Sequence, residues 1–312
     1  MRRILLALAL ACAAASGAHA QARTIKLVVP YPPGGTADIV ARLLGDQIGR
    51  SGGPSVVIEN RPGANTIVGA EAVARAAPDG NTVGMISPEF IVNPHLRKPN
   101  YDPVTSFEPV CRLVSSPTVI IVNAASPHRT LKDLIDAARA KPGDVTMAST
   151  GIFQIPIEQL KRAANVNFTY VPFQGNAPAS NALLGDHVTS VFSVYPTVAE
   201  LIKSGKVRAL GIESRKRIDA LPDVPTIIES GYADYEVEVW LGLVAPAKTD
   251  LLAVAHIADL FTNALLSGDV KAKLAGQDSY PSIVCGPEFA AALKKQYDDV
   301  GRTVRESNIK AD

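Results

Sequence analysis

The 312-residue chain carries 31 basic and 30 acidic side chains, and this near-zero net charge gives it no surface suited to nucleic acid or anionic lipid. With 47% hydrophobic residues, the length suits two domains that each bury a core. The histidines are widely separated and neither Cys-x-x-Cys nor His-Glu-x-x-His occurs, so no common metal-site motif is present.

The N-terminus has the pattern of a secretory signal. Two arginines precede an apolar run, Ile4 to Ala15, that is too short to span a bilayer, and a small-x-small cleavage site lies at 18–20. We therefore expect residues 1–20 to be a cleavable signal peptide and the exported, periplasmic chain to begin at Gln21. A lipoprotein anchor at Cys12 is the alternative, but the three residues before it match the usual lipobox poorly.

Processing leaves 29 basic and 30 acidic residues, and it leaves two cysteines, Cys111 and Cys285. In an oxidising compartment these two could pair and tie the middle of the chain to its C-terminal segment. Two buried free thiols are the alternative. Both states are compatible with the sequence.

The stretch from Val28 to Asp38 predicts a buried strand that runs through a Pro-Gly loop straight into a helix. Apolar residues recur at helical spacing from Ile39 onward, and Thr36 is placed to cap the helix. Gly34 and Gly35 allow a bound group to approach the backbone closely. The first amides of the helix, at the positive end of its dipole, form a site for a carboxylate. The alternative is a tight turn without a ligand.

The first third of the chain alternates strand and helix, which predicts a right-handed parallel α/β unit. Ligands bind such sheets beyond the carboxyl ends of the strands, here the loops at 31–36 and 60–66 and Ser87. The predicted strands cover 27–29, 56–59 and 82–86, and the predicted helices begin at Ile39 and cover 67–77.

The alternation returns after two β-rich runs, at 108–114 and 118–122. Thr130 is placed to cap the first helix of this second series, and small or polar loops at 149–151 and 172–176 end two of its strands. The predicted helices cover 131–140, 155–164, 177–184 and 197–204, and the predicted strands cover 145–148, 169–171, 188–194 and 207–212.

Two α/β lobes that face each other across a ligand cleft are the simplest interpretation. We assign 21–122 and 243–312 to lobe 1 and 123–242 to lobe 2. A β-rich run at 236–244 carries the chain back, so two crossing strands join the lobes as a hinge. Helices predicted at 249–266, 269–274 and 287–306 pack on lobe 1.

The sequence gives no positive signal for catalysis. Neither a Gly-x-Ser-x-Gly elbow nor a Walker phosphate loop occurs. Asp38 and Glu59 could be considered as a catalytic pair of carboxylates. Acidic residues at a helix start and a strand end, however, more often interact with the helix dipole or stabilise a turn than act in catalysis. We therefore expect no enzyme and no cofactor.

Several motifs in a fixed order resemble the Bug family of periplasmic solute-binding proteins, which serve tripartite tricarboxylate transporters. The resemblance covers essentially the whole mature chain. The motifs are Val-Pro-Tyr-Pro-Pro-Gly-Gly-Thr-Ala-Asp at 29–38, Glu-Asn-Arg-Pro-Gly-Ala-Asn at 59–65, Ala-Pro-Asp-Gly at 77–80, Tyr-Asp-Pro at 101–103, Phe-Glu-Pro-Val at 107–110, Val-Pro-Phe-Gln-Gly at 171–175, Gly-Lys-Val-Arg-Ala-Leu at 205–210, Leu-Pro-Asp-Val-Pro-Thr at 221–226 and Trp-Leu-Gly-Leu-Val-Ala-Pro at 240–246.

The resemblance implies a two-lobed, type II periplasmic-binding-protein fold that closes on a small organic carboxylate, with a membrane permease as partner. One strand-to-helix loop of each lobe then holds the ligand through backbone amides and ordered waters. A monomer is expected. Carried over to this chain, the site comprises Tyr31, Gly34, Gly35, Thr36 and Ser87 in lobe 1, and Thr150, Gly151, Phe173, Gln174 and Gly175 in lobe 2.

Two departures from the family pattern add Gln154 and Ser193 to the expected site. Gln154 stands where the family often has a histidine, and Phe153 beside it adds an aromatic ring. Ser193 stands where many members carry an aspartate that could pair with an amine, so its presence disfavours amino-acid ligands. Aromatic residues, among them Tyr31 and Phe173, either enclose a flat or elongated carbon skeleton or belong to the core.

The sequence leaves the ligand's identity open among aromatic dicarboxylates, aliphatic diacids, citrate-like acids and nicotinate-like monoacids. All of them suit loops that bind through backbone amides. An extracytoplasmic sensor that reports ligand occupancy to a signalling receptor is an alternative role, and an enzyme acting on a small carboxylate is a weaker one.

Overall fold

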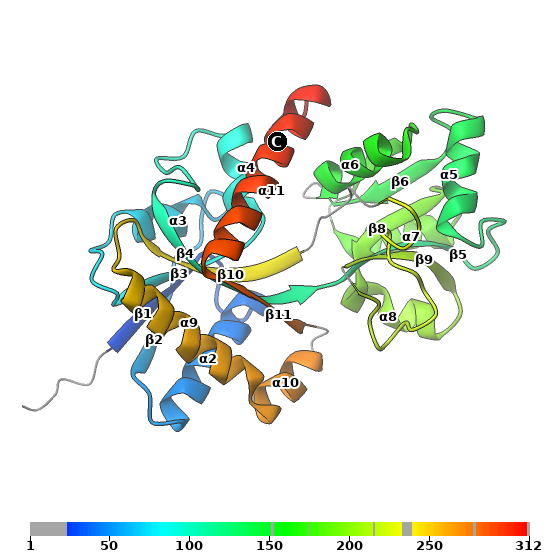
Figure 1. The fold of residues 1–312 in the computed structure, drawn as a ribbon. Helices are drawn as coiled ribbons and strands as arrows, with labels where there is room; N and C mark the ends of the chain where they lie inside the picture. Colours follow the sequence, from blue (N-terminus) through cyan, green and yellow to red (C-terminus); the bar gives the residue numbers. More distant parts are fainter. Residues whose placement is uncertain are drawn as a thin grey trace, which may run out of the picture.

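The chain folds into two α/β lobes, each built around its own β-sheet (Figure 1). The computed structural model describes residues 24–150, 153–173, 175–214, 216–232, 239–276 and 279–310. Within these ranges, the first lobe has a six-stranded sheet in the order β11-β4-β10-β3-β1-β2, and the second has a five-stranded sheet in the order β7-β6-β8-β5-β9. The expected two-lobed α/β architecture is confirmed. The expected signal peptide lies outside the described residues.

The two sheets are mixed. In the first lobe β1 pairs in parallel with β2 and β3, as the strand and helix alternation predicts, whereas β10 runs antiparallel to β3 and β4. The first sheet contains β1 (Thr24–Val29), β2 (Ser55–Asn60), β3 (Thr82–Ile86), β4 (Phe107–Ser116), β10 (Val239–Pro246) and β11 (Tyr280–Cys285). The second contains β5 (Thr118–Asn123), β6 (Thr146–Ser149), β7 (Thr169–Pro172), β8 (Ser190–Val194) and β9 (Val207–Glu213).

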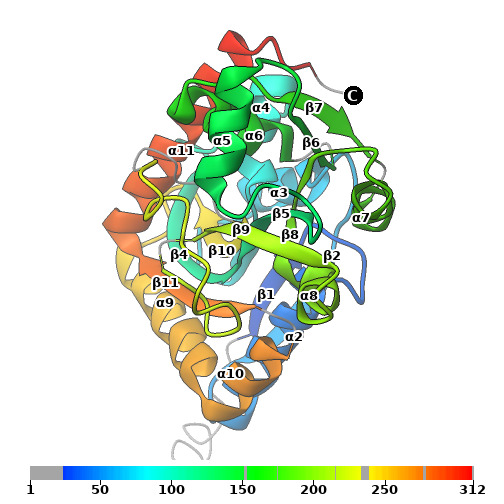
Figure 2. The same cartoon turned by 90° about the vertical axis from the view of Figure 1, so that its right-hand side faces the viewer.

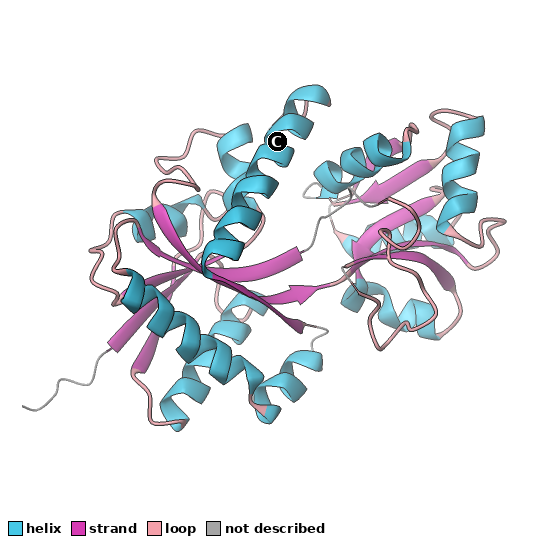
Figure 3. Ribbon diagram, viewed as in Figure 1, coloured by secondary structure: helices cyan, strands magenta, loops and turns pink. Residues whose placement is uncertain are grey.

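Helices lie on both sides of the strands in each lobe (Figure 3). The first lobe has α2 (Thr36–Arg50), α3 (Ile67–Ala74), α4 (Glu89–Leu96), α9 (Leu251–Leu266), α10 (Gly268–Ala275) and α11 (Gly286–Glu306). The second has α5 (Leu131–Ala140), α6 (Gln154–Ala164), α7 (Asn176–Leu184) and α8 (Tyr195–Lys203). Thr130 caps α5 as predicted: its hydroxyl accepts from the amide of Asp133, whose carboxylate accepts from the Thr130 amide in return.

The chain crosses between the lobes at two places. Pro117 separates β4 of the first sheet from β5 of the second, and the second change of sheet falls between β9 and β10. The sequence-based division instead placed 118–122 in lobe 1 and 239–242 in lobe 2. Figure 2, in which the second lobe faces the reader, shows the two lobes one behind the other.

A third contact between the lobes joins α6 to the C-terminal helix α11, and it is not part of the predicted hinge. Ile155 of α6 packs in the same apolar cluster as Trp240, Phe289 and Val300 of the first lobe. A salt bridge of 2.9 Å between Arg162 and Glu306 lies at the edge of this contact.

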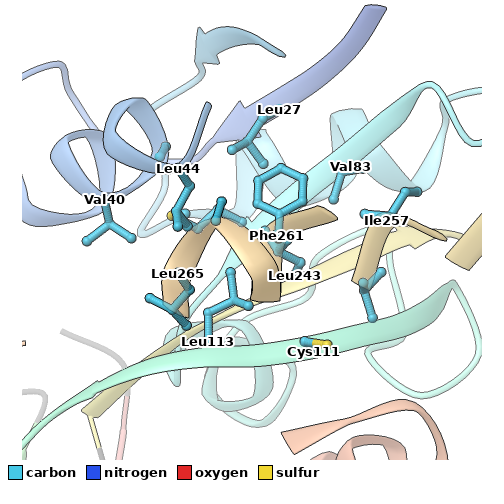
Figure 4. Packing of buried hydrophobic residues seen from close by; sticks show 14 of the residues in the cluster. Leu27, Val40, Leu44, Val83, Cys111, Leu113, Leu243, Ile257, Phe261 and Leu265 are labelled. Atoms are coloured by element: carbon cyan, nitrogen blue, oxygen red, sulfur yellow. The ribbon is translucent and has the colours of Figure 1, made fainter. Parts of the chain in front are cut away.

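The main core of the first lobe lies between its sheet and the helices α2 and α9 (Figure 4). Val40 and Leu44 of α2 and Phe261 and Leu265 of α9 are fully buried there, next to Leu27 of β1.

Among the described residues, no single helix has the length and apolarity to cross a membrane, and α9 with α10 reaches that composition only as a pair bent by 70°.

Two elements of the first lobe were not predicted from the sequence. Helix α4 contains Pro94, and strand β11 contains Pro281, and proline usually argues against a helix interior and against a paired strand. Packing decides both cases: Phe90 and Ile91 of α4 are buried, and β11 pairs antiparallel with β4.

A disulfide joins Cys111 of β4 to Cys285 of β11, so the structure favours pairing over two free thiols. The two residues are also cross-strand partners in the sheet, and Cys111 is fully buried. The bond therefore fixes the edge strand β11, and with it the start of α11, to a central part of the first lobe.

Replacing both cysteines by alanine should lower the free energy of unfolding by about 2–5 kcal/mol, because the bond closes a loop across 174 positions of sequence. Urea denaturation of the mature chain measures the change. The control is the wild-type chain after full reduction, which loses the bond but keeps both sulfur atoms. Equal midpoints for the oxidised chain and both modified forms would contradict the prediction.

Candidate ligand-binding cleft

A cleft of about 780 Å³ lies between the two lobes. The first lobe contributes the loop before α2, helix α4, parts of β4 and β10, the second half of α11 and the residues that follow α11. The second contributes mainly the start of α6. A volume of this size is typical of a small-molecule site.

The carboxylate of Asp38 organises the loop before α2. The Gly34 amide and the Arg42 guanidinium each donate to its Oδ2 at 2.9 Å. The Asn60 side-chain amide donates to its Oδ1 at 2.9 Å and to the Tyr31 carbonyl at 3.1 Å. Asp38 is buried, and the Arg42 hydrogen bond, with those from Gly34 and Asn60, lowers its pKa to about 2. The Gly34 amide is therefore engaged inside the loop and does not face the cleft.

The N-terminus of α2 lines the cleft through Gly35, Thr36 and Ala37. Gly35 is the N-cap residue and no side-chain capping bond is present, so the predicted capping role of Thr36 is wrong: Thr36 is already the first residue of the helix. Helix geometry leaves the amides of the first turn without an acceptor inside the helix. Together with the helix dipole, the Thr36 and Ala37 amides can bind an anion.

Next to this helix start, Tyr31, Ser87 and Glu89 form a hydrogen-bonded group. The hydroxyl oxygens of Tyr31 and Ser87 are 2.7 Å apart. Ser87 donates to Glu89 Oε2 at 2.6 Å, and Tyr31 reaches the same oxygen at 3.3 Å. Burial, followed by the charge of Glu89, raises the pKa of Tyr31 far above its ordinary value. Tyr31 therefore remains a neutral phenol.

The second lobe presents Phe153, Gln154 and Gln159 to the cleft. Phe153 also packs on Phe192 in the core of that lobe, with 5.4 Å between ring centroids. Within the described part of the chain, the buried Oε1 of Gln159 has no hydrogen-bond partner. The side-chain carbonyl oxygen of Gln159 is therefore an unused acceptor at the cleft.

Trp240 and Glu213 line the cleft near the two crossings between the lobes. The Trp240 indole donates to Gln296 Oε1 at 3.2 Å, which links β10 to α11. The Thr118 hydroxyl at the start of β5 donates to the buried carboxylate of Glu213 at the end of β9. Sequence reasoning missed Trp240, Glu213 and Glu89, because it considered the loops that follow the strands and not side chains within the strands or in the next helix.

The expected site residues fall into three groups. Tyr31, Gly35, Thr36, Ser87 and Gln154 line the cleft, whereas Gly151 and Gln174 lie outside the described residues. The remaining five are described but do not line it, and a role for them in binding stays a prediction; they are Gly34, Thr150, Phe173, Gly175 and Ser193.

Ser193 was expected to contact the ligand, but its side chain lies inside the second lobe and does not line the cleft. It is fully buried in β8, and its hydroxyl pairs with that of Thr197 of α8 at 2.9 Å.

Among the described residues, no group of three or more His, Cys, Asp or Glu side chains is arranged to hold a metal ion.

The profile of the family described as tripartite tricarboxylate transporter family receptor matches residues 40–308. Protein BugT of Bordetella pertussis is 31% identical over an alignment of 315 residues, which covers 98% of this chain and 96% of BugT. Among solved structures, the periplasmic binding protein BugD is 31% identical, with a TM-score of 0.67 and coverage of 92% of this chain and 98% of BugD.

Two other similar structures contain a carboxylate. Rpa4515 of R. palustris, solved with adipate, is 27% identical, with a TM-score of 0.70 and coverage of 93% of this chain and 99% of that one. MatC of Rhodopseudomonas palustris, with bound malate, is 29% identical, with a TM-score of 0.65 and coverage of 91% and 99%.

Replacing Asp38 by Asn should lower the free energy of unfolding at pH 7 by about 1–3 kcal/mol, because charge-assisted hydrogen bonds hold the loop. The pKa of about 2 in the folded state lies below that of an unfolded aspartate, about 3.9. Asp38 therefore stabilises the fold above about pH 4, and its contribution is lost as the pH falls toward 2.

Urea unfolding at pH 7 and pH 3 tests both points: the Asp38→Asn chain should lose less stability on acidification than the wild type. Asp46→Asn is the matched control, since Asp46 is an exposed aspartate of the same helix. An Asp38→Asn chain with the wild-type pH dependence would show that the carboxylate does not stabilise the loop.

Proposed function

The chain belongs to the tripartite tricarboxylate transporter receptor family, and we propose that it captures a small organic carboxylate in the cleft between its lobes and delivers it to a membrane permease. The family and the similar structures are solute-binding proteins and not enzymes. We further propose that the mature chain begins at Gln21 and acts in the periplasm as a monomer.

The observation that carries the carboxylate assignment is the exposed start of α2 in the cleft. The Thr36 and Ala37 amides are donors fixed by the helix, and they lie at its positive end. Hydrogen bonds to a charged group are worth roughly 1.5–3 kcal/mol each. Two or three of them, with apolar contacts, suffice for micromolar binding, about −8 kcal/mol. The adipate and malate bound by two relatives support the same class of ligand.

We propose that binding closes the lobes about the two crossings, at Pro117 and between β9 and β10. The cleft is lined from both lobes, by Thr36 on one side and Gln154 on the other, so a ligand that contacts both stabilises the closed state. The permease would then recognise the closed shape.

The first test is the thermal midpoint of the mature chain, freed of ligand by unfolding and refolding, against mono-, di- and tricarboxylates with sugars as controls. A ligand at 100 times its dissociation constant adds about 2.7 kcal/mol and should raise the midpoint by several degrees. A shift with one class of carboxylate supports the proposal, and a shift with sugars alone contradicts it.

Capture of membrane proteins by the liganded and the ligand-free chain tests the second half of the proposal. Retention of a permease by the liganded chain supports a transport role. Retention of a signalling receptor in its place would favour a sensor.

Replacing Gly35 by Val should weaken carboxylate binding at least tenfold while the chain still folds. A Cβ at Gly35 has only one neighbour within 4 Å, the Pro32 carbonyl oxygen at 3.7 Å, and the backbone there is extended, so the fold tolerates the side chain. Its methyl groups would block access to the amides at the start of α2.

Isothermal titration calorimetry with the best carboxylate of the panel measures this effect. Gly49→Val is the control, because Gly49 lies in the same helix and a Cβ there meets nothing within 4 Å. Unchanged affinity of the Gly35→Val chain would remove the helix start from the site.

A further inference from the structure

In the group formed by Tyr31, Ser87 and Glu89, both hydroxyls have hydrogen-bond partners within the group, and acceptor lone pairs remain. Glu89, as a carboxylate, has no hydrogen to give, and Ser87 and Tyr31 have one each. If Ser87 donates to Glu89 at 2.6 Å, the Tyr31 hydrogen points to Ser87 at 2.7 Å or to Glu89 at 3.3 Å. If Ser87 donates to Tyr31, the Tyr31 hydrogen points to Glu89. In each of these arrangements both hydrogens lie inside the group.

The remaining lone pairs of the group are at the cleft. Tyr31, Ser87 and Glu89 all line it, and Glu89 is half-buried, so its second carboxylate oxygen is within reach of a bound molecule. Among the described side chains, no Lys, Arg or His forms an ion pair with Glu89. No cation among the described side chains therefore contacts Glu89 directly, and its carboxylate faces the same cleft as Arg97 and Lys310.

This wall of the cleft repels a carboxylate and attracts a donor. A ligand carboxylate placed against it would meet lone pairs and a like charge, whereas the amides of Thr36 and Ala37 next to it attract an anion. The cleft thus presents an anion-binding wall and an acceptor wall close together, because Tyr31 lies in the loop that leads into α2.

We propose that the ligand is a carboxylate that also carries a hydrogen-bond donor, a hydroxyl or a protonated amine, and that Glu89 accepts this donor and sets the specificity. This rests on the proposed function, since it takes the α2 amides as the carboxylate site. The charge of Glu89 places a protonated amine ahead of a hydroxyl. Ser193, which disfavoured amines in the sequence analysis, faces α8 and does not line the cleft.

Matched acids that differ in one substituent test the proposal. Succinate, malate and aspartate share a four-carbon skeleton and carry H, OH or NH₃⁺ at one carbon. Adipate, 2-hydroxyadipate and 2-aminoadipate form the six-carbon set, and propionate, lactate and alanine form the monoacid set. Calorimetry on the wild-type chain should give at least tenfold tighter binding for the hydroxy or amino acid than for the unsubstituted acid of the same set.

The Glu89→Gln chain should lose this preference, because its amide carries no charge and brings two hydrogens of its own. Binding of the substituted acids should fall at least tenfold, and binding of the unsubstituted acid should hold or improve. Glu288→Gln is the matched control: Glu288 also follows a proline at the start of a helix, α11, but is exposed and does not line the cleft. It should bind like the wild type.

The outcomes separate this inference from the proposed function. If the wild type binds the unsubstituted acid as tightly as its substituted partners, or if Glu89→Gln changes all three equally, the donor requirement is overturned and carboxylate binding stands. If no acid in the three sets binds while sugars do, the proposed function fails and the inference fails with it. The relative affinities of the hydroxy and amino acids distinguish a neutral from a charged donor.

Discussion

The hydrogen bonds of the Asp38 carboxylate are the interaction on which the ligand cleft depends. A loop rich in proline and glycine has little secondary structure of its own, yet it must hold the end of β1 and the start of α2 in one arrangement. Asp38, in the first turn of α2, binds the Gly34 amide before it and the Asn60 side chain at the end of β2. One buried carboxylate thereby connects two strand ends and a helix start. The charge of Arg42 keeps it ionised, so charge-assisted bonds hold the loop in addition to the packing of Tyr31 against the core.

This arrangement determines which amides remain for a ligand. Asp38 already neutralises part of the positive potential at the start of α2 and engages Gly34, so the anion site consists of the amides that follow, at Thr36 and Ala37. Glu89 then restricts which groups can lie beside the carboxylate of the ligand. An acidic residue beside an anion site is unfavourable unless a hydrogen-bond donor lies between them. The hydrogen-bonding pattern of the cleft is therefore directional. Its walls distinguish the two functional groups of a ligand.

The sequence predicted the elements and the family well but predicted the site only in part. Apolar spacing gave nearly all strands and helices, since periodicity follows burial directly. The role of Thr36 was misassigned because helix starts shift by a residue with the cap geometry. Gly34 was expected to face a ligand, and no spacing rule shows that Asp38 engages its amide. Glu89 lies three residues beyond the end of the predicted strand 82–86, and extending the strand-end rule into the next helix would have included it.

The proposed closure of the cleft requires that one lobe is internally rigid and that the other lobe can move relative to it. The disulfide between β4 and β11 and the pairing of β4 with β10 make the first lobe rigid up to Ser116, one residue before the crossing at Pro117. In the proposed closure, bending would fall at the crossings and at the contact of α6 with α11, where Ile155 lies among apolar residues of the first lobe. Because Gln154 precedes Ile155 in α6, any movement at that contact also moves a side chain of the cleft. The proposed closure would therefore be coupled to ligand contact through the start of α6, so that the affinity of the cleft would depend on the position of the second lobe.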